Sequence, residues 1–413
     1  MTAPAAPAPT PTTTSPAPAR SRVAVAACPT YAPTDVAAAL AEVLAAVGGL
    51  GAFVRPGQTV LLKPNLLSPR APDEAVTTHP ELVRQLALLC ARAGAARIWV
   101  GDSPAGGHRE ATLWARTGLA AALAGTPATL VSWETRQVPR PCAGELLAVP
   151  EWLAAVDVII SLPKLKTHSL TMLTGALKNV FGLVAGQAKA NCHAKYPSPQ
   201  TMSRFLVEVH ATLRPHLSLM DAVVAMEGHG PANGRPLPVG VLLASVDAVA
   251  LDAVACAPLR LAPAAVPMIR LAAARGLGRL DAAGIEAVGS GVERLRAARM
   301  KPSLARYLKL IPEPAFGLLT RLCRLRPVIQ NGACVRCGIC SAGCPAKAIA
   351  PDPHTGFPRI APAACIVCFC CMESCPHAAI VMQMSLAGTL PVAYRAAKKG
   401  PVGAGAGAGR PRP

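Results

Sequence analysis

The chain has 413 residues, a formal net charge of +19 and 15 cysteines, and aromatic residues make up only 3% of it. This length is too great for a ferredoxin alone and indicates two or three domains with cores built from Ala, Val and Leu. Despite the positive charge, the scarcity of aromatic side chains for base stacking and the lack of a recognised binding module argue against a nucleic-acid partner.

Residues 1–21 form a tail rich in Ala, Pro and Thr, which predicts disorder. The tail lacks the apolar segment of a secretory signal peptide. Seven cysteines lie outside the two motifs near the C-terminal end, scattered singly or beside a motif. Cysteine usage of this kind fits a reducing compartment, so we expect the protein to be cytoplasmic.

Residues 22–292 alternate between strand and helix patterns, which predicts an α/β domain with a mostly parallel sheet. The expected strands are 59–62, 97–100, 129–133, 157–162 and one that begins at 218–220, and the expected helices are 81–93 and 200–213. The most apolar stretch, 239–259, contains Asp247 and Asp252. Each would cost about 2.5–3.5 kcal/mol near the centre of a membrane helix. We therefore expect a buried strand followed by a helix there, and no transmembrane segment.

Four of the expected strands end in clusters of polar residues. Ligands of open parallel sheets bind at the carboxyl ends of the strands, so these clusters should meet in one crevice. The candidate catalytic residues are Lys63, Asn65, Asp102, Lys164, Lys166, His168, Lys178 and Asp221. Clustered ammonium groups repel one another unless an anion or carboxylates lie among them. The pattern predicts an anionic small molecule in the crevice, covered by a polar loop at 187–199.

The roles of these residues stay open at this level. Asp102 and Asp221 fit general bases, counter-ions or metal ligands, and His168 fits proton transfer near neutral pH. Taken singly, each lysine is also consistent with a strand end in water, and each aspartate with a helix cap. No dinucleotide-binding glycine motif occurs in a strand–turn–helix setting, and there is no Walker motif. We therefore do not expect NAD, FAD or ATP.

Residues 293–327 are expected to form a basic linker, because Arg294 to Arg326 contains nine Lys or Arg and one acid, Glu313. A basic flexible tail is expected at 387–413, where there are five Lys or Arg and no acid. Such charge fits ordinary solvation. It equally fits docking to an acidic redox partner protein or peripheral contact with an anionic membrane surface.

One cysteine pattern occurs twice, at an offset of 31 residues. The copies are Cys334-x2-Cys337-x2-Cys340-x3-Cys344-Pro345 and Cys365-x2-Cys368-x2-Cys371-x3-Cys375-Pro376. This spacing is typical of cubane iron–sulfur clusters, with the fourth cysteine of each copy serving the other cluster. We expect two 4Fe-4S clusters, one on Cys334, Cys337, Cys340 and Cys375 and the other on Cys365, Cys368, Cys371 and Cys344. The motif predicts a small α+β two-cluster ferredoxin-like domain at 328–386.

Zinc knuckles and a disulfide framework are the alternatives for these cysteines. A tetrahedral zinc site needs only two knuckles, and a disulfide framework needs an oxidising compartment, so both fit less well. Cys370 lies beside Cys371, but its use as a ligand would break the match between the two copies. We interpret Cys370 as a buried or second-sphere thiol, with a ligand swap as the other reading.

The motifs of the α/β region resemble the domain-of-unknown-function family 362. The matching elements are Lys63-Pro64-Asn65, Thr78-His79-Pro80, Gly101-Asp102-Ser103-Pro104, Pro163-Lys164-Leu165-Lys166-Thr167-His168, Gly175-x2-Lys178-Asn179, Asp221 and Glu227-Gly228-His229-Gly230-Pro231. The resemblance covers roughly residues 22–290. It implies a C-terminal two-cluster ferredoxin module, which many members carry, and a site, but no reaction, because the family has no assigned activity.

Three functions follow as hypotheses. The first is an iron–sulfur oxidoreductase that acts on an anionic small molecule at the strand ends. The second is an electron-transfer subunit whose basic segments dock an acidic partner enzyme. The third is a binding module whose clusters sense the redox state.

Overall fold

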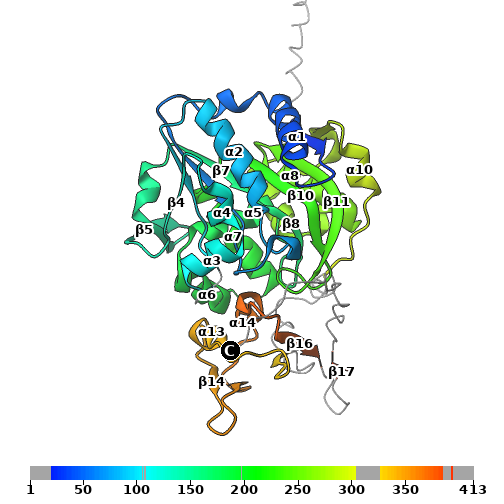
Figure 1. The fold of residues 1–413 in the computed structure, drawn as a ribbon. Helices are drawn as coiled ribbons and strands as arrows, with labels where there is room; N and C mark the ends of the chain where they lie inside the picture. The colour runs from blue at the N-terminus through cyan, green and yellow to red at the C-terminus, as the bar shows by residue number, and fades with distance from the viewer. Residues whose placement is uncertain are drawn as a thin grey trace, which may run out of the picture.

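The computed structural model describes residues 20–104, 106, 108–196, 198–303, 326–384 and 392–393. The predicted N-terminal tail up to residue 19, the linker from 304 to 325 and nearly all of the predicted C-terminal tail lie outside the described residues. The larger domain spans 20–303, and the cysteine-rich module follows it and lies below it in Figure 1.

A ten-stranded sheet forms the centre of the larger domain, with the main order β12–β1–β11–β10–β7–β2–β3–β4 and with β8 and β9 attached beside β10. The strands are β1 (Ser21–Ala27), β2 (Thr59–Pro64), β3 (Arg97–Val100), β4 (Ala128–Leu130), β7 (Val158–Leu162), β8 (Lys164–His168), β9 (Met172–Leu173), β10 (Leu217–Glu227), β11 (Arg235–Ser245) and β12 (Ile285–Val288). Along the main order, only the two pairs that include β11 are antiparallel. The predicted mostly parallel α/β sheet is confirmed.

Helices cover both faces of this sheet, because successive strand residues point to opposite faces. In β2, Leu61 enters one hydrophobic core, whereas Val60 and Leu62 enter the other. The helices are α1 (Pro33–Ala46), α2 (Pro80–Arg92), α3 (Glu110–Arg116), α4 (Leu119–Leu123), α5 (Ala176–Asn179), α6 (Gly186–Lys195), α7 (Pro199–Thr212), α8 (Ala248–Ala255), α9 (Pro267–Ala274) and α10 (Val292–Ala297). Helices α1 and α2 pack on the Val60 face, and α7, α8 and α9 pack on the Leu61 face. A separate hairpin joins β5 (Gln137–Cys142) to β6 (Glu145–Pro150).

The structure differs from the sequence-based expectations at three places around the strand ends. The segment expected to be a polar turn after Leu162 continues as β8, which is buried along its whole length. The expected loop at 187–199 is mostly helix α6, which ends at Lys195. Asp221 lies inside β10 rather than after its end. In each case, packing against neighbouring elements extends regular structure through polar residues that in isolation favour a turn.

The stretch 239–259 contains the end of β11 and all of α8, as expected for a buried strand and helix. Asp247 caps α8 by accepting from the backbone N–H groups of Val249 and Ala250, both at 2.9 Å. Across the described parts of the chain, we find no helix that has the length and apolarity to cross a membrane.

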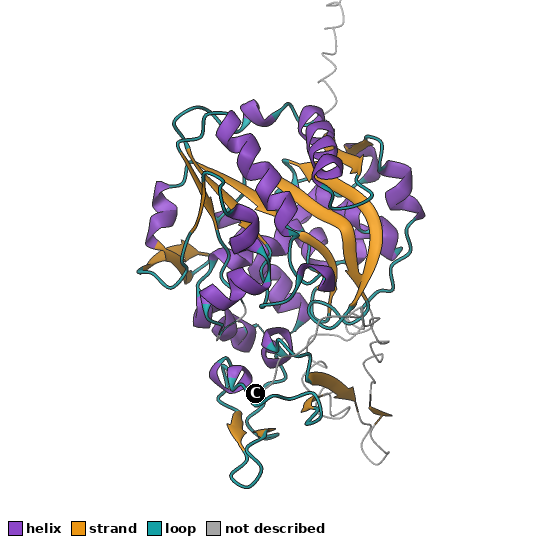
Figure 2. Ribbon diagram, viewed as in Figure 1, coloured by secondary structure: helices purple, strands orange, loops and turns teal. Residues whose placement is uncertain are grey.

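The cysteine-rich module is built from short elements, which Figure 2 distinguishes by colour. They are β13 (Arg326–Ile329), α13 (Ile339–Ala342), β14 (Ile349–Pro351), β15 (Pro358–Ile360), α14 (Cys370–Ser374), β16 (Ile380–Met384) and β17 (Val392–Ala393). Strands β13, β16 and β17 form one small sheet, and β14 and β15 pair as a hairpin. This agrees with the predicted α+β module, although β13 starts two residues before the expected boundary at 328. Strand β17 lies inside the segment that was expected to be a flexible tail.

Buried polar contacts join the module to the larger domain. Arg70, which is 4% exposed, donates from Nη2 to the backbone carbonyl of Cys375 at 3.3 Å. Asn233 donates from Nδ2 to the carbonyl of Ile380 at 3.1 Å. Because Arg70 also bonds Glu74 and the Ala232 carbonyl, the same side chain braces two loops of the larger domain against the module.

Candidate functional site at the module boundary

The two cysteine loops fold in the same way. Arg336 and Gly338 flank Cys337 with φ of 57° and 76°, and Val367 and Phe369 flank Cys368 with φ of 57° and 59°. Residues other than glycine adopt this left-handed conformation at a cost of about 1–3 kcal/mol, so they keep it where the surroundings fix the backbone. The repeat at an offset of 31 residues therefore extends from the sequence to the backbone geometry.

A second repeated feature concerns the fourth cysteine of each copy. Cys344 Sγ accepts a hydrogen bond from the backbone N–H of Ala348, and Cys375 Sγ accepts one from Ala379, both at 3.3 Å. Hydrogen bonds to the sulfurs are one of the means by which proteins set the potential of iron–sulfur clusters. Thiolates that accept backbone hydrogen bonds are the donor set that such clusters require.

Four cysteines gather around a small cavity in the module, and the four other motif cysteines interact with one another. Cys334, Cys337, Cys340 and Cys375 line one small cavity in the module, and none of the other ten cysteines that the structure describes does. In the other set, the thiols of Cys371 and Cys365 interact electrostatically with each other and with Cys344 and Cys368, and Cys371 also interacts with Cys340 of the first set. Among the residues that the structure describes, no three Cys, His, Asp or Glu side chains are gathered tightly enough for a single metal ion. A cubane holds four irons, so its ligand sulfurs lie farther apart than the ligands of one ion.

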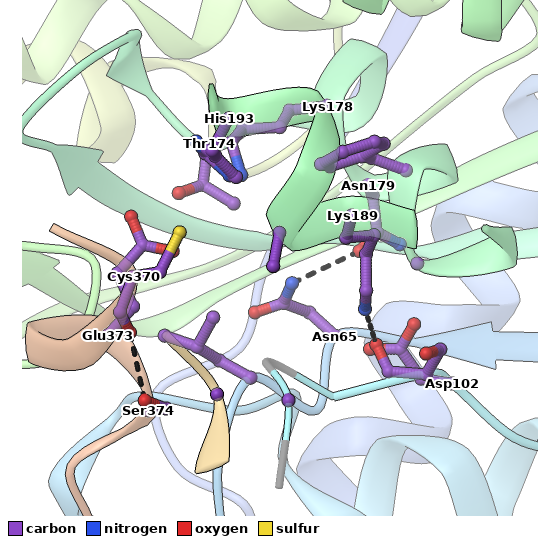
Figure 3. A pocket seen from close by; sticks show the side chains of 17 residues that line it. Asn65, Asp102, Thr174, Lys178, Asn179, Lys189, His193, Cys370, Glu373 and Ser374 are labelled. Carbon is purple, nitrogen blue, oxygen red and sulfur yellow. Dashed lines mark hydrogen bonds between the residues drawn. The ribbon is translucent and has the colours of Figure 1, made fainter. Parts of the chain in front are cut away.

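A second cavity lies between the α/β domain and the cysteine-rich module, and we call it the boundary cavity. Its lining residues are Asn65, Leu67, Asp102, Ser103, Gly106, Thr174, Lys178, Asn179, Phe181, Gly182, Lys189, Ala190, His193, Gly343, Cys370, Glu373 and Ser374. The last four come from the cysteine-rich module and the others from the α/β domain, as Figure 3 shows. The cavity volume is about 70 Å³, which is room for roughly five water molecules at 10–15 Å³ each.

One wall of the boundary cavity contains a buried ion pair. Lys63 Nζ, which is 0% exposed, lies 2.7 Å from Asp102 Oδ1 and 3.3 Å from Asn179 Oδ1. Burial lowers the pKa of Lys63, and Asp102 opposes that shift. Gly182 is required beside this pair, because a Cβ at that position would lie 1.8 Å from Asp102 Oδ1 and 2.7 Å from Lys63 Nζ.

Two further lysines face the cavity. Lys189, on α6, donates from Nζ to the backbone carbonyl of Ser103, and Lys178, on α5, has its Nζ 5.9 Å from the centre of the Phe181 ring. Burial lowers the pKa of Lys189 to about 7 and also lowers the pKa of Lys178. The carboxylate of Glu373, from the opposite module, acts against both shifts. The cavity is therefore an electropositive space with one carboxylate projecting into it from α14.

Several buried polar atoms around the cavity have no hydrogen-bond partner in the described structure. They are Asn65 Oδ1, Thr174 Oγ1 and His193 Nδ1. Burial lowers the pKa of His193 to about 3, with Lys178 adding to the effect, so its imidazole is neutral. Buried polar groups in native proteins nearly always have partners, so unpaired atoms around one cavity indicate a place for a polar ligand or ordered water.

Comparison with known proteins agrees with this two-part architecture. The model of a family described as "Domain of unknown function (DUF362)" matches residues 60–257, and that of a "4Fe-4S dicluster domain" matches residues 326–376. A thylakoid-associated protein of Synechocystis sp. is 37% identical over 242 residues, which make up 58% of this chain and 74% of that protein. The chain belongs to family 362. Its C-terminal module makes it an iron–sulfur protein.

Two solved structures match this family 362 protein at low similarity. The lactate racemase apoprotein from Thermoanaerobacterium thermosaccharolyticum has a TM-score of 0.38 and 10% identity, and a structural-genomics protein from Thermotoga maritima has a TM-score of 0.31 and 11% identity. The matches cover 54% of this chain, and 54% and 56% of those chains respectively. The chain thus spans about half the length of each solved protein.

The structure divides the eight α/β candidates of this family 362 protein into groups. Asn65, Asp102 and Lys178 line the boundary cavity, and Lys63 pairs with Asp102 in its wall. Lys166 and His168 do not line the cavity. Lys166 Nζ donates to the carbonyl of Val76 at 2.6 Å, and His168 Nε2 lies 3.4 Å from Glu373 Oε1. The single crevice expected for all eight residues is therefore only partly formed.

Lys164 and Asp221 form a different arrangement with Tyr31 and His79, which we call the closed centre. Lys164 Nζ donates to Asp221 Oδ2 and to Tyr31 Oη, both at 2.8 Å, and Tyr31 Oη donates to Asp221 Oδ1 at 2.7 Å. His79 stacks on Tyr31 with ring centres 3.6 Å apart, and its backbone N–H donates to Asp221. None of these four residues lines the boundary cavity. The convergence of Lys164 and Asp221 with the other candidates was wrongly predicted, because both point into the interior from paired strands.

Three residues that line the cavity were not predicted as site residues from the sequence, namely Lys189, Glu373 and Cys370. Lys189 was hidden because its segment looked like a covering loop, whereas α6 places it with His193 over the cavity. Glu373 had no signal beyond its position between Cys371 and Cys375. Helix α14 lies near Lys178 and Lys189 only because the cysteine-rich module docks against the α/β domain.

Proposed function

We propose that this family 362 protein holds two 4Fe-4S clusters and carries out a redox reaction on a small anionic compound in the boundary cavity. The observation that carries the proposal is the composition of the cavity walls. Lysines from the α/β domain form one side, and residues adjacent to cluster cysteines form the other. A bound compound would lie beside the redox module without any further movement of the chain.

The cluster ligands in this proposal are the two cysteine sets expected from the spacing. Cys334, Cys337, Cys340 and Cys375 hold one cluster, which agrees with the cavity that these four residues line. Cys344, Cys365, Cys368 and Cys371 hold the other. Cys370 is not a ligand, because it corresponds to Ile339 at the offset of 31 residues, and Cys371 corresponds to Cys340. When bound, such clusters supply single electrons at potentials set by hydrogen bonds and burial.

Charge and size define the class of ligand. The cavity and its wall hold three lysines, Lys63, Lys178 and Lys189, against two carboxylates, Asp102 and Glu373. One positive charge is thus in excess when all five are ionised. Asn65 and His193 add polar atoms that a ligand can pair. A carboxylate or oxyanion with few non-hydrogen atoms fits both the charge and the cavity volume of about 70 Å³.

The residues have separate roles in this proposal. Lys178 and Lys189 bind the anion, and Asn65 orients it. Asp102 holds Lys63 charged and accepts a hydrogen bond from the backbone N–H of Leu66 at 2.7 Å, which fixes the loop after β2. His193 is a neutral imidazole, and its Nδ1, which has no hydrogen-bond partner among the described residues, can form a hydrogen bond with the bound compound.

A redox partner is part of the proposal. Cys337 of the first cysteine set is exposed, and Val335, two residues before it in the chain, is 57% exposed. An exposed apolar side chain next to a cluster loop is a suitable contact for a transient electron-transfer partner. This same feature supports the second candidate, an electron-transfer subunit without a reaction of its own.

The first test is anaerobic purification with iron and sulfide quantitation, for which two cubanes give about eight irons per chain. Zinc in place of iron would overturn the proposal at its base. The second test reduces the protein with dithionite and adds a panel of small carboxylates and oxyanions. Recovery of the visible absorbance of oxidised clusters by one of them, with little recovery in Lys178→Met, supports the oxidoreductase. Reversible clusters and no anion binding would favour the electron-transfer subunit.

A further inference from the structure

The boundary cavity adjoins the second cysteine set more closely than the first. Two of its lining residues, Gly343 and Cys370, directly precede Cys344 and Cys371 in the chain. The thiol of Cys370 also forms a hydrogen bond with Cys368, a third member of the second set. Three of the four cysteines in that set are thus neighbours, in sequence or by contact, of the cavity wall.

The first cysteine set is attached to the boundary cavity by a single residue. Ser374 lines the cavity and precedes Cys375, whereas the four cysteines of the first set line their own separate cavity. A charge that enters the boundary cavity should therefore act more strongly on the second cysteine set than on the first.

The charges at this boundary interact across the two modules. Glu373 is 5% exposed and interacts electrostatically with Lys178, Lys166 and Lys189 of the α/β domain. The side chains of Glu373 and Lys189 are buried, so a change of one unit of charge on either side acts through a medium of lower dielectric constant than bulk water. Such interactions are much stronger than those between charges in bulk water.

We propose that anion binding in the boundary cavity and reduction of the cluster on Cys344, Cys365, Cys368 and Cys371 oppose each other. Reduction adds one negative charge beside the cavity, and the anion adds another between Lys178 and Lys189. The bound anion lowers the midpoint potential of this cluster, and reduction weakens anion binding by the same factor, because the two effects are one coupling free energy. The inference rests on the proposed function, since it requires that the cavity binds an anion.

This coupling gives the site a release step. The oxidised protein retains the anion, reduction of the cluster weakens its binding between Lys178 and Lys189, and reoxidation restores the form that binds anions. The lysines therefore act both as a binding site and as the element that links occupancy to the redox state.

The test is an anaerobic potentiometric titration followed by electron paramagnetic resonance, with dithionite as reductant and acetate or sulfate as the probe. Ionic strength is held constant with a bulky sulfonate salt. We expect saturating probe to lower the potential of one cluster and to shift the other less than half as much. A tenfold difference in affinity between the oxidised and reduced forms corresponds to about 59 mV for one electron. Cys337→Ser, which changes the signal of the cluster on the first set, assigns the two signals.

Lys178→Met should abolish the probe-dependent shift, and Lys195→Met is the matched control, because Lys195 is exposed and pairs with Glu145 outside the cavity. Isothermal titration of the probe into the oxidised and the reduced protein separates the possible failures. No binding in either state would refute the anion site and with it the proposed function. Binding of equal strength in both states, or equal shifts of both clusters, would overturn the coupling and leave the site standing.

Discussion

Two buried lysine–carboxylate pairs lie in this protein, and their surroundings differ. In the closed centre, Asp221 accepts hydrogen bonds from Lys164, Tyr31 and the His79 backbone, and the Lys164 side chain is 1% exposed. In the boundary cavity, the pair of Lys63 and Asp102 adjoins two more lysines and several polar atoms without partners.

The difference shows how the same residue types take structural or binding roles. A buried ion pair is stable when its remaining hydrogen-bonding atoms are satisfied, as they are in the closed centre. Extra cations and unpaired atoms are costly unless something else occupies the space beside them. The closed centre therefore holds strands β8 and β10 to the loop before α1, whereas the boundary cavity has room for the ligand that we propose.

The largest expected effect comes from breaking the closed centre. Asp221→Ala would leave the Lys164 ammonium buried with only Tyr31 as a partner, so we expect a loss of about 3–5 kcal/mol in the free energy of unfolding. Denaturant titration of the anaerobically purified protein measures it. Asp221→Asn, which keeps an acceptor, should lose less. A change below about 1 kcal/mol in Asp221→Ala would show that the centre is more hydrated than its burial indicates.

The next effect concerns the close approach at Gly182. In Gly182→Ala the new Cβ would overlap Asp102 and crowd Lys63, so we expect a loss of about 1–3 kcal/mol in the free energy of unfolding. Anion binding should weaken at the same time, because the Lys63–Asp102 pair forms the wall of the cavity. Gly144→Ala is a control in open space, although its φ of +80° adds backbone strain. Gly51→Ala, in open space without positive φ, is the cleaner control.

Replacing one lysine by methionine in the boundary cavity, and one in the closed centre, should distinguish a binding role from a structural role most clearly. Lys178→Met removes a partly buried ammonium with no hydrogen bond among the described contacts, so stability should change by less than about 1 kcal/mol. Anion affinity should fall at least tenfold. Lys164→Met should do the reverse, lowering stability and leaving anion affinity nearly unchanged. Calorimetry with acetate or sulfate and parallel denaturant titrations measure both, and identical behaviour of the two variants would contradict the division.

The smallest expected effect is a pH dependence of anion binding. The pKa of Lys189 is lowered to about 7 by burial, with Lys63 and Lys178 adding to the shift and Asp102 and Glu373 opposing it. A bound anion favours the protonated form and so raises this pKa. Affinity should therefore be full below pH 7 and fall by up to tenfold per pH unit above it, until the pKa of the complex is reached. Lys189→Arg, which stays charged, should flatten the profile, and an unchanged slope would exclude Lys189 as its source.

The sequence correctly predicted the strands and helices that have strong local sequence signals. Strands β2, β3 and β7 and helices α2 and α7 lie within two residues of their expected positions, because apolar runs bounded by turn residues specify them. The two cysteine sets were also predicted from spacing alone, since a cubane requires thiolates at fixed short intervals. The division of these cysteines between two clusters stays a prediction.

The site was predicted less completely, because it depends on which direction each side chain faces. Lysines 63, 164 and 166 looked equivalent at the ends of predicted strands, yet β8 turns Lys164 toward Asp221 and Lys166 toward the Val76 carbonyl. These directions follow from the pairing of β8 with β10. No local signal in the sequence marks where pairing between distant segments stops.

By itself, the sequence determined that this chain joins an α/β domain to a 4Fe-4S module with a repeated cysteine motif, because periodicity and ligand spacing are local properties. The tertiary structure alone decided which polar residues meet. It placed Glu373 and Cys370 of α14 opposite Lys178 and Lys189, and it enclosed Lys164 with Tyr31. Such contacts join residues far apart in the chain, so they follow from domain docking and strand pairing rather than from any motif.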